Sequence, residues 1–120
     1  MKNLVICSLV LLFISCSENK NMSHTETAQI VAESFFSKDK SILKKHTTPA
    51  GYSSLIMGLN AMPDSDKVIK VEILEEAIDG EIAWVKYKTS FDGKSGIFKL
   101  VKENDEWKVT SKGPREKGPF

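Results

Sequence analysis

Hydrophobic and polar positions follow three different patterns along this chain. Residues 4–14 are apolar except for Ser8, residues 23–60 have apolar positions three or four apart, and from residue 66 onward the two kinds alternate. A spacing of three and four places side chains on one face of a helix, and alternation places them on one face of a strand. The pattern therefore predicts helices first and a sheet afterwards.

The helical part divides into three predicted helices. Residues 23–26, Ser-His-Thr-Glu, have the form of a capping box, so the first helix begins there and ends near Ser37. Asp39 can cap a short second helix that runs through His46, and Pro49 suits the first turn of a third helix that ends near residue 60. The apolar face of the first helix carries Ala28, Val31, Ala32, Phe35 and Phe36.

The first hairpin turn sets the register of the predicted sheet. Residues 78–80, Ile-Asp-Gly, suit a three-residue turn with a left-handed glycine, which pairs Ile73 with Val85. A two-residue turn would place Ile73 opposite Lys86, and we reject it because a shift of one residue reverses the faces of a strand.

Two further turns complete a four-stranded meander. The dipeptides at 92–93, Asp-Gly, and at 104–105, Asn-Asp, are predicted two-residue turns. The pairs predicted across them are Tyr87 with Phe98 and Leu100 with Val109. One face of the sheet then carries Val71, Ile73, Ala83, Val85, Tyr87, Phe91, Phe98, Leu100, Trp107 and Val109. We expect Trp107 of this face, and Phe35 of the first helix, to be buried where helix and sheet meet.

The expected architecture is a single α+β domain. N-terminal helices pack on a curved, antiparallel four-stranded meander, which gives a cone-like shape over residues 23–112. Residues 113–120 contain two glycines and two prolines, and we expect them to form a flexible tail.

The apolar N-terminal run is too short to span a membrane. Leu4 to Ile14 is eleven residues, which is about 16 Å of helix against a hydrocarbon core of ~30 Å. Lys2 precedes it, and a short charged start before such a run is typical of a signal peptide. Residues 1–15 are therefore a predicted signal peptide.

Residues 12–16, Leu-Phe-Ile-Ser-Cys, resemble the lipobox of bacterial lipoproteins. The resemblance implies cleavage before Cys16, a diacylglyceryl group on its sulfur, and anchoring in the cell envelope. Ser17 is compatible with sorting to the outer membrane, and the polar residues 16–22 would form a tether. The alternative is an ordinary secretory signal followed by a free thiol.

Composition and charge exclude some classes of function. The 17 basic and 16 acidic residues leave a net charge of +1, and loss of Lys2 with the signal peptide leaves 16 of each. A nucleic-acid binder needs a basic surface, so this balance argues against one. Cys7 and Cys16 are the two cysteines, so the mature domain has no disulfide and no metal site built on cysteine.

The order of elements resembles the cone-shaped nuclear-transport-factor-2-like fold. Within that fold, the chain resembles small lipoproteins of unknown function related to lumazine-binding proteins. The resemblance rests on residues 28–38, 48–49, 70–80, 81–88 and 98–109. It implies a cone that opens at one end, and the short connection between helices and sheet implies a shallow one.

Candidate catalytic chemistry is sparse. His24 lies in the first turn of a helix and is interpreted as a solvated residue, and His46 as a capping or packing residue. Glu75 and Glu76 are adjacent and therefore point to opposite faces of a strand, with Glu75 on the face of Ile73. The spacing fits no known metal or nucleophile motif, so we expect no catalytic residue, metal or cofactor.

A ligand cavity is one candidate site. The open end of the cone would be lined by Phe36, Leu55, Tyr87 and Phe98. The alternative is that these side chains fill the core.

An interface on the outer face of the sheet is the other candidate site. The predicted register places Leu74, Trp84 and Val101 in one row, with Ile82 diagonal to it. An apolar row among lysines indicates a protein interface, and the resemblance implies a homodimer. Two alternatives remain: the C-terminal tail folds back over the row, through Phe120, or Trp84 lies flat on lysine stems.

Three function hypotheses follow. The first is a non-catalytic envelope lipoprotein that binds a small molecule or a peptide. The second is a structural or interaction module at the membrane surface. The third is a ketosteroid-isomerase-like enzyme, which the resemblance permits but for which no full catalytic set is found.

Overall fold

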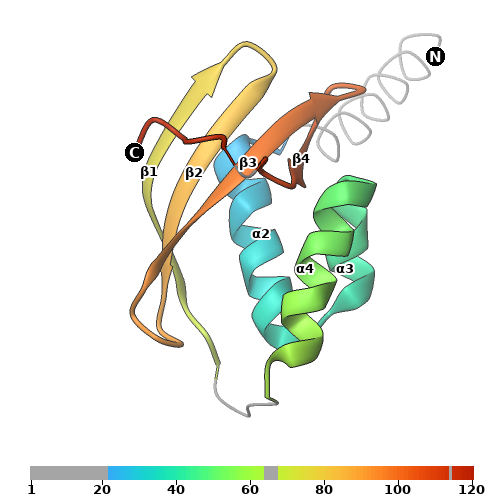
Figure 1. The fold of residues 1–120 in the computed structure, drawn as a ribbon, viewed down its shortest axis with the longest axis vertical. Coiled ribbons are helices and arrows are strands. Elements are labelled where there is room, and N and C mark those ends of the chain that lie inside the picture. Colours follow the sequence, from blue (N-terminus) through green and yellow to red (C-terminus); the bar gives the residue numbers. More distant parts are fainter. Residues whose placement is uncertain (1–21, 64–67, 114) are drawn as a thin grey trace, which may run out of the picture.

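A computed structural model describes residues 22–63, 68–113 and 115–120 of the chain. Three helices, α2 (His24–Ser37), α3 (Lys40–Lys45) and α4 (Pro49–Ala61), precede four strands. The strands are β1 (Val71–Asp79), β2 (Ile82–Thr89), β3 (Ser95–Glu103) and β4 (Glu106–Thr110). The helices lie on one face of a twisted sheet, as Figure 1 shows, so the predicted α+β class is confirmed.

Each helix begins at the residue that the sequence indicates. Ser23 and Glu26 form the capping box of α2, the Asp39 carboxylate accepts from the Ile42 amide in α3, and the Thr48 hydroxyl accepts from an amide of α4. These side chains satisfy amide groups that the first turn of a helix leaves without partners. The three predicted helices are therefore confirmed to within one or two residues.

The strand order β1-β2-β3-β4 is confirmed, but the predicted register is correct only for the last hairpin. Leu100 pairs with Val109 as predicted. Tyr87 pairs with Gly96 and not with Phe98, because residues between Thr89 and Ser95 form a longer turn than the expected dipeptide. A shift of two residues leaves the faces unchanged, which is why the apolar face was still predicted correctly.

The first hairpin differs from the prediction in a more consequential way. Its turn is Gly80-Glu81, with Asp79 opposite Ile82, so the three-residue turn is wrong. Leu74 is an extra residue in β1 that has no partner in β2, and this β-bulge separates two stretches of regular pairing. Beyond the bulge the faces of β1 are reversed relative to the prediction.

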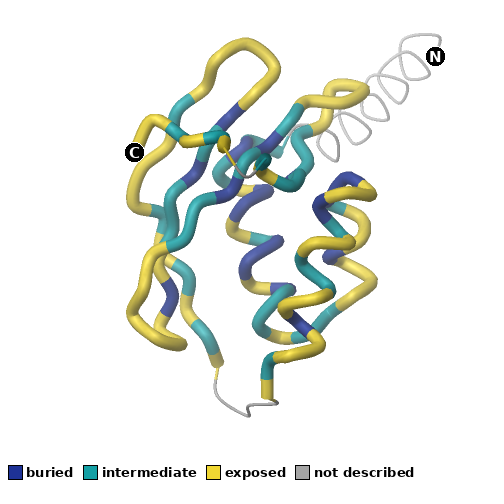
Figure 2. The backbone as a smooth tube through the Cα atoms, in the orientation of Figure 1, coloured by how far each residue is buried: buried dark blue, intermediate teal, exposed yellow. Residues whose placement is uncertain are grey.

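The core lies between α2 and the middle of the sheet. Its buried apolar residues are Ala28, Val31, Ala32, Leu43, Leu59, Ala83, Val85, Phe98, Leu100 and Val109. Figure 2 shows these buried segments facing one another across the two layers. Phe35 and Trp107, which we expected to be buried, pack against this core but remain half-exposed, because each lies at an end of the layer.

Candidate functional site

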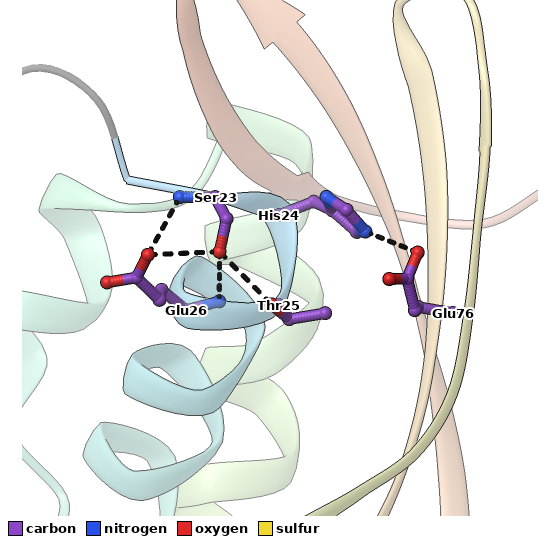
Figure 3. Close-up of polar contacts among 5 residues, drawn as sticks. All are labelled: Ser23, His24, Thr25, Glu26 and Glu76. Carbon is purple, nitrogen blue, oxygen red and sulfur yellow. Dashed lines mark hydrogen bonds and ion pairs between the residues drawn. The ribbon is translucent and has the colours of Figure 1, made fainter.

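His24 is held in place by the start of α2. The capping box fixes the first turn, since Ser23 Oγ accepts from the Glu26 amide at 3.1 Å and the Glu26 carboxylate accepts from the Ser23 amide at 3.3 Å. Figure 3 shows the Glu26 side chain on the side of Ser23 away from Glu76 and the His24 ring directed toward Glu76. The His24 ring therefore points toward the sheet.

The bulge at Leu74 supplies the partner of this histidine. Glu75 pairs with Lys86 on the outer face, so Glu76, opposite Val85, lies on the face that the helices cover. His24 Nε2 lies 2.8 Å from Glu76 Oε1 (Figure 3). This bond joins the first turn of α2 to β1 across 52 residues of sequence.

His24 is buried, with 8% of its surface exposed, so its interpretation as a solvated residue is wrong. Its ring also meets the Trp107 ring edge-on, with 5.8 Å between the centroids. Glu75 was likewise assigned to the wrong face, because the bulge reverses the alternation between Ile73 and Glu75. The sequence contains no local signal for a partner so far away.

The geometry makes the His24–Glu76 pair a tie between layers. A carboxylate beside an imidazole can orient a catalytic base, but a nucleophile or substrate must lie at the other nitrogen. The hydroxyls of Ser23 and Thr25 hydrogen-bond to each other at 3.0 Å, and Ser23 Oγ also accepts from the Glu26 amide (Figure 3). The arrangement stabilises the fold and does not form a nucleophile–base pair.

His46 is the C-terminal cap of α3, as predicted. Its amide donates to the last carbonyls of that helix, and its carbonyl accepts from the Val109 amide of β4 at 3.0 Å. Burial lowers the pKa of the His46 ring; Lys45 and Lys108 lower it further, and Glu106 opposes them. The ring is therefore neutral near neutral pH, which suits a packing residue.

The structure places the four predicted cavity residues in three different surroundings. Tyr87 stacks on Phe98, with 4.5 Å between the ring centroids. Phe36, at the end of α2, contacts Phe91 of the β2–β3 turn, with 5.4 Å between the ring centroids. Leu55 is half-buried against the core. Phe91, which was predicted on the covered face of the sheet and not as a site residue, lies in the turn between β2 and β3 and contacts Phe36.

Tyr87 is held tightly at this end of the sheet. Its phenol lies over Gly96, where an added Cβ would be 2.6 Å from the hydroxyl oxygen. Burial raises the pKa of the Tyr87 phenol, and the Asp92 carboxylate raises it further. The phenol is therefore a neutral hydroxyl at the edge of an aromatic surface. A cavity at this place stays a prediction.

The predicted interface row does not exist as a row. Leu74 lies at the bulge, and Trp84 faces Ala77 on one side and Lys99 on the other, because both hairpins differ from the expected register. Ile82 pairs with Val101, diagonal to Trp84. The homodimer through this face stays a prediction. The C-terminal segment lies on Trp84, so a second copy of the chain could reach Trp84 only if that segment moved away.

Several predicted features concern parts of the chain that the structure does not describe. The lipidation site Cys16, the signal peptide and the tether up to residue 21 lie outside the described residues. Among residues 22–63, 68–113 and 115–120, no three acidic, histidine or cysteine side chains are grouped to hold a metal ion. No helix in these ranges is long and apolar enough to cross a membrane.

Comparison with known proteins supports the fold. No family model and no curated protein matches the sequence. A solved structure from Campylobacter jejuni, named as an NTF2-like transpeptidase, superposes with a TM-score of 0.53 at 14% identity. The match covers 71% of this chain and 94% of that one. At this identity the likeness shows only the fold, which is the nuclear-transport-factor-2-like (NTF2-like) fold that the order of elements resembled.

Proposed function

We propose that this chain is a lipid-anchored protein of the bacterial cell envelope whose NTF2-like domain binds an apolar small molecule or peptide without catalysis. Binding would take place where the end of α2 meets the β2–β3 turn. The observation that carries the proposal is the half-exposed aromatic cluster there, formed by Phe35, Phe36 and Phe91. We call these three residues the aromatic cluster.

The aromatic cluster keeps an apolar surface in contact with solvent. Phe91 is 44% exposed although it packs against Phe36. Tyr87, with its neutral hydroxyl, comes from the adjacent part of β2 and offers a polar atom next to an apolar surface. Apolar walls with few polar groups are typical of small-molecule sites.

The choice of a non-catalytic function rests on the chemistry of the described residues. Glu76 is the hydrogen-bond partner of the buried histidine, and the hydroxyl of the preceding residue, Ser23, serves the helix cap. The transpeptidase activity in the name of the Campylobacter jejuni protein belongs to that protein, and a likeness of fold does not transfer an activity.

The anchoring part of the proposal rests on the sequence around Cys16. A diacylglyceryl group and an amide-linked acyl chain would hold the chain firmly, because each buried methylene contributes ~0.8 kcal/mol. The tether would reach Ser23, the cap of α2, so the folded domain would hang from the first turn of that helix. Ser17 supports placement in the outer membrane.

An apolar fluorescent dye, anilinonaphthalene sulfonate, tests the binding site. A chain that starts at Ser17 keeps every described residue, and we expect it to bind the dye saturably. Phe91→Ser should weaken binding about tenfold, since covering part of a phenylalanine contributes ~1–2 kcal/mol. Met57→Ser is the matched control, because Met57 is 75% exposed on α4. Equal dye binding by the Phe91 variant and the native chain would refute the site.

A further inference from the structure

The described part of the C-terminal segment, residues 113 and 115–120, lies on the outer face of the sheet. It leaves β4 after Thr110 and crosses β3 toward β2, as Figure 1 shows in dark red. Two of its residues make contacts there: Glu116 with Lys99, and Gly118 with Trp84. The segment therefore covers part of the apolar patch on which the homodimer was predicted.

Glu116 provides a charged contact. Its Oε2 accepts a hydrogen bond from Lys99 Nζ, and its Oε1 accepts one from the Gly113 amide at 2.8 Å. The Lys99 side chain is only 15% exposed, so this lysine is largely desolvated beside the carboxylate. The lysine and the Gly113 amide lower the pKa of the Glu116 carboxyl. The carboxylate is therefore charged, and each of its two oxygens accepts one hydrogen bond.

Gly118 provides a contact that depends on shape. A Cβ added at this residue would lie 2.9 Å from Cε3 of Trp84, closer than a side chain can approach. The peptide backbone therefore lies directly on the indole ring. Lys99 stands on the same ring, with Nζ 5.9 Å from its centroid, so Trp84 and Lys99 form one recognition surface.

We propose that Trp84 and Lys99 form a docking surface for a peptide in which an acidic residue closes a short turn and stands two positions before a glycine-proline pair. The chain's own C-terminal segment is the resident occupant and competes with such a peptide supplied by a partner. The lysine selects the carboxylate, and the flat indole accepts only a residue without a side chain. Proline after the glycine disfavours a helical conformation at that glycine, so the chain does not coil where it meets the indole.

A short linker makes the resident segment a strong competitor. Ser111 and Lys112 are all that separates the segment from β4, so its effective concentration at the surface is in the mM range. A free peptide with the same contacts should therefore bind poorly to the native chain. It should bind when the resident segment is released.

The test uses a fluorescein-labelled peptide with the sequence of residues 113–120 and measures its fluorescence anisotropy. The protein is the chain from Ser17 to Phe120, either native or with Gly118→Val, which forces a side chain into Trp84. Glu116→Lys is a second releasing variant, since it places two cations together. We expect both variants to bind the peptide about tenfold more tightly than the native chain.

Two controls assign the contacts. Trp84→Ala, added to the Gly118→Val chain, should abolish peptide binding, whereas Met57→Ser, at an exposed position of α4, should leave it unchanged. A peptide in which glutamine replaces the residue equivalent to Glu116 should bind weakly, because Lys99 would lose its charged partner.

Several results would overturn the proposal. It fails if neither releasing variant binds the peptide at mM concentration, if native and variant chains bind it equally, or if binding survives Trp84→Ala. It also fails if the Gly118→Val chain binds no peptide but self-associates in a way that Trp84→Lys abolishes. That last result would make a second copy of the chain the occupant.

Discussion

At the scale of single residues, the neighbours Glu75 and Glu76 differ in how much each contributes to the free energy of unfolding, because they lie on opposite faces of the sheet. Glu76 bonds to the buried His24 at 2.8 Å, whereas Glu75 approaches Lys86 at 3.6 Å on the exposed face. We expect Glu76→Ala to lower the free energy of unfolding by about 1 kcal/mol, since it leaves a buried imidazole without its partner. Glu75→Ala should lower it by less than about 0.5 kcal/mol, as for other exposed ion pairs.

Urea denaturation of the two variants at pH 7 measures this difference. Both substitutions remove a carboxylate from β1, so changes in strand preference and net charge are matched. Equal losses of stability, or a larger loss for Glu75→Ala, would contradict the assignment of His24 and Glu76 as a tie between layers.

His46 gives the domain a predictable pH dependence. Its pKa is lowered in the folded state, chiefly by burial, so below pH 6.5 the unfolded chain binds a proton that the folded chain resists. The stability from this residue is present above pH 6.5 and is lost as the pH falls through the folded pKa. Native protein should therefore lose more stability than His46→Gln between pH 7.5 and 5. A steeper loss in the variant would contradict this.

At the scale of the elements, two glycines on α4 predict opposite responses to alanine. A Cβ at Gly51 would lie 2.4 Å from the Val109 carbonyl oxygen of β4, so Gly51→Ala pushes helix and strand apart. We expect it to cost ~1–3 kcal/mol. A Cβ at Gly58 would meet Phe35 at an ordinary 3.4 Å, so Gly58→Ala should stabilise the helix by ~0.5–1 kcal/mol.

Thermal unfolding of both alanine variants, monitored by circular dichroism, distinguishes these effects. The melting temperature should fall for Gly51→Ala and rise for Gly58→Ala. A shift of the same sign in both would mean that helix preference, and not the contact between α4 and β4, sets the outcome.

The sequence predicts the helices better than the hairpins, for a physical reason. Capping residues such as Ser23, Asp39 and Thr48 act within one turn, so a short stretch of sequence contains the whole signal. The register of β1 depends instead on a bulge and a turn whose energies are set by the partner strand. The tie between His24 and Glu76 was missed for the same reason, since it requires the bulge to be known first.

At the scale of the whole molecule, the proposed lipid anchor at Cys16 would decide where the domain works. We expect cells that express the native chain to incorporate labelled fatty acid into it and to retain it in the membrane fraction. Cys16→Ala should lose both, because the sulfur is the proposed attachment point and acyl chains supply the membrane affinity. Equal labelling of native and variant protein would remove the anchor from the proposal.

The candidate sites differ in how far the sequence could predict them. Aromatic residues such as Phe36 and Tyr87 were chosen because each lies on the apolar face of its own helix or strand. A register shift of two residues leaves the face of a strand residue unchanged, so this choice did not depend on the exact pairing. The row through Leu74 and Trp84 required the exact register, and it was wrong. The contact of Gly118 with Trp84 depends on how an irregular segment returns to the sheet, which alternation and periodicity do not encode.

The bulge at Leu74 also has a consequence for the evolution of the chain length. Removing Leu74 would leave Ile73 and Glu75 adjacent, opposite Tyr87 and Lys86, and the ladder would be regular throughout. A deletion of this one residue therefore turns no side chain to the wrong face. Homologues one residue shorter here would keep the same sheet, and an alignment gap between Ile73 and Glu75 would mark a neutral change in length.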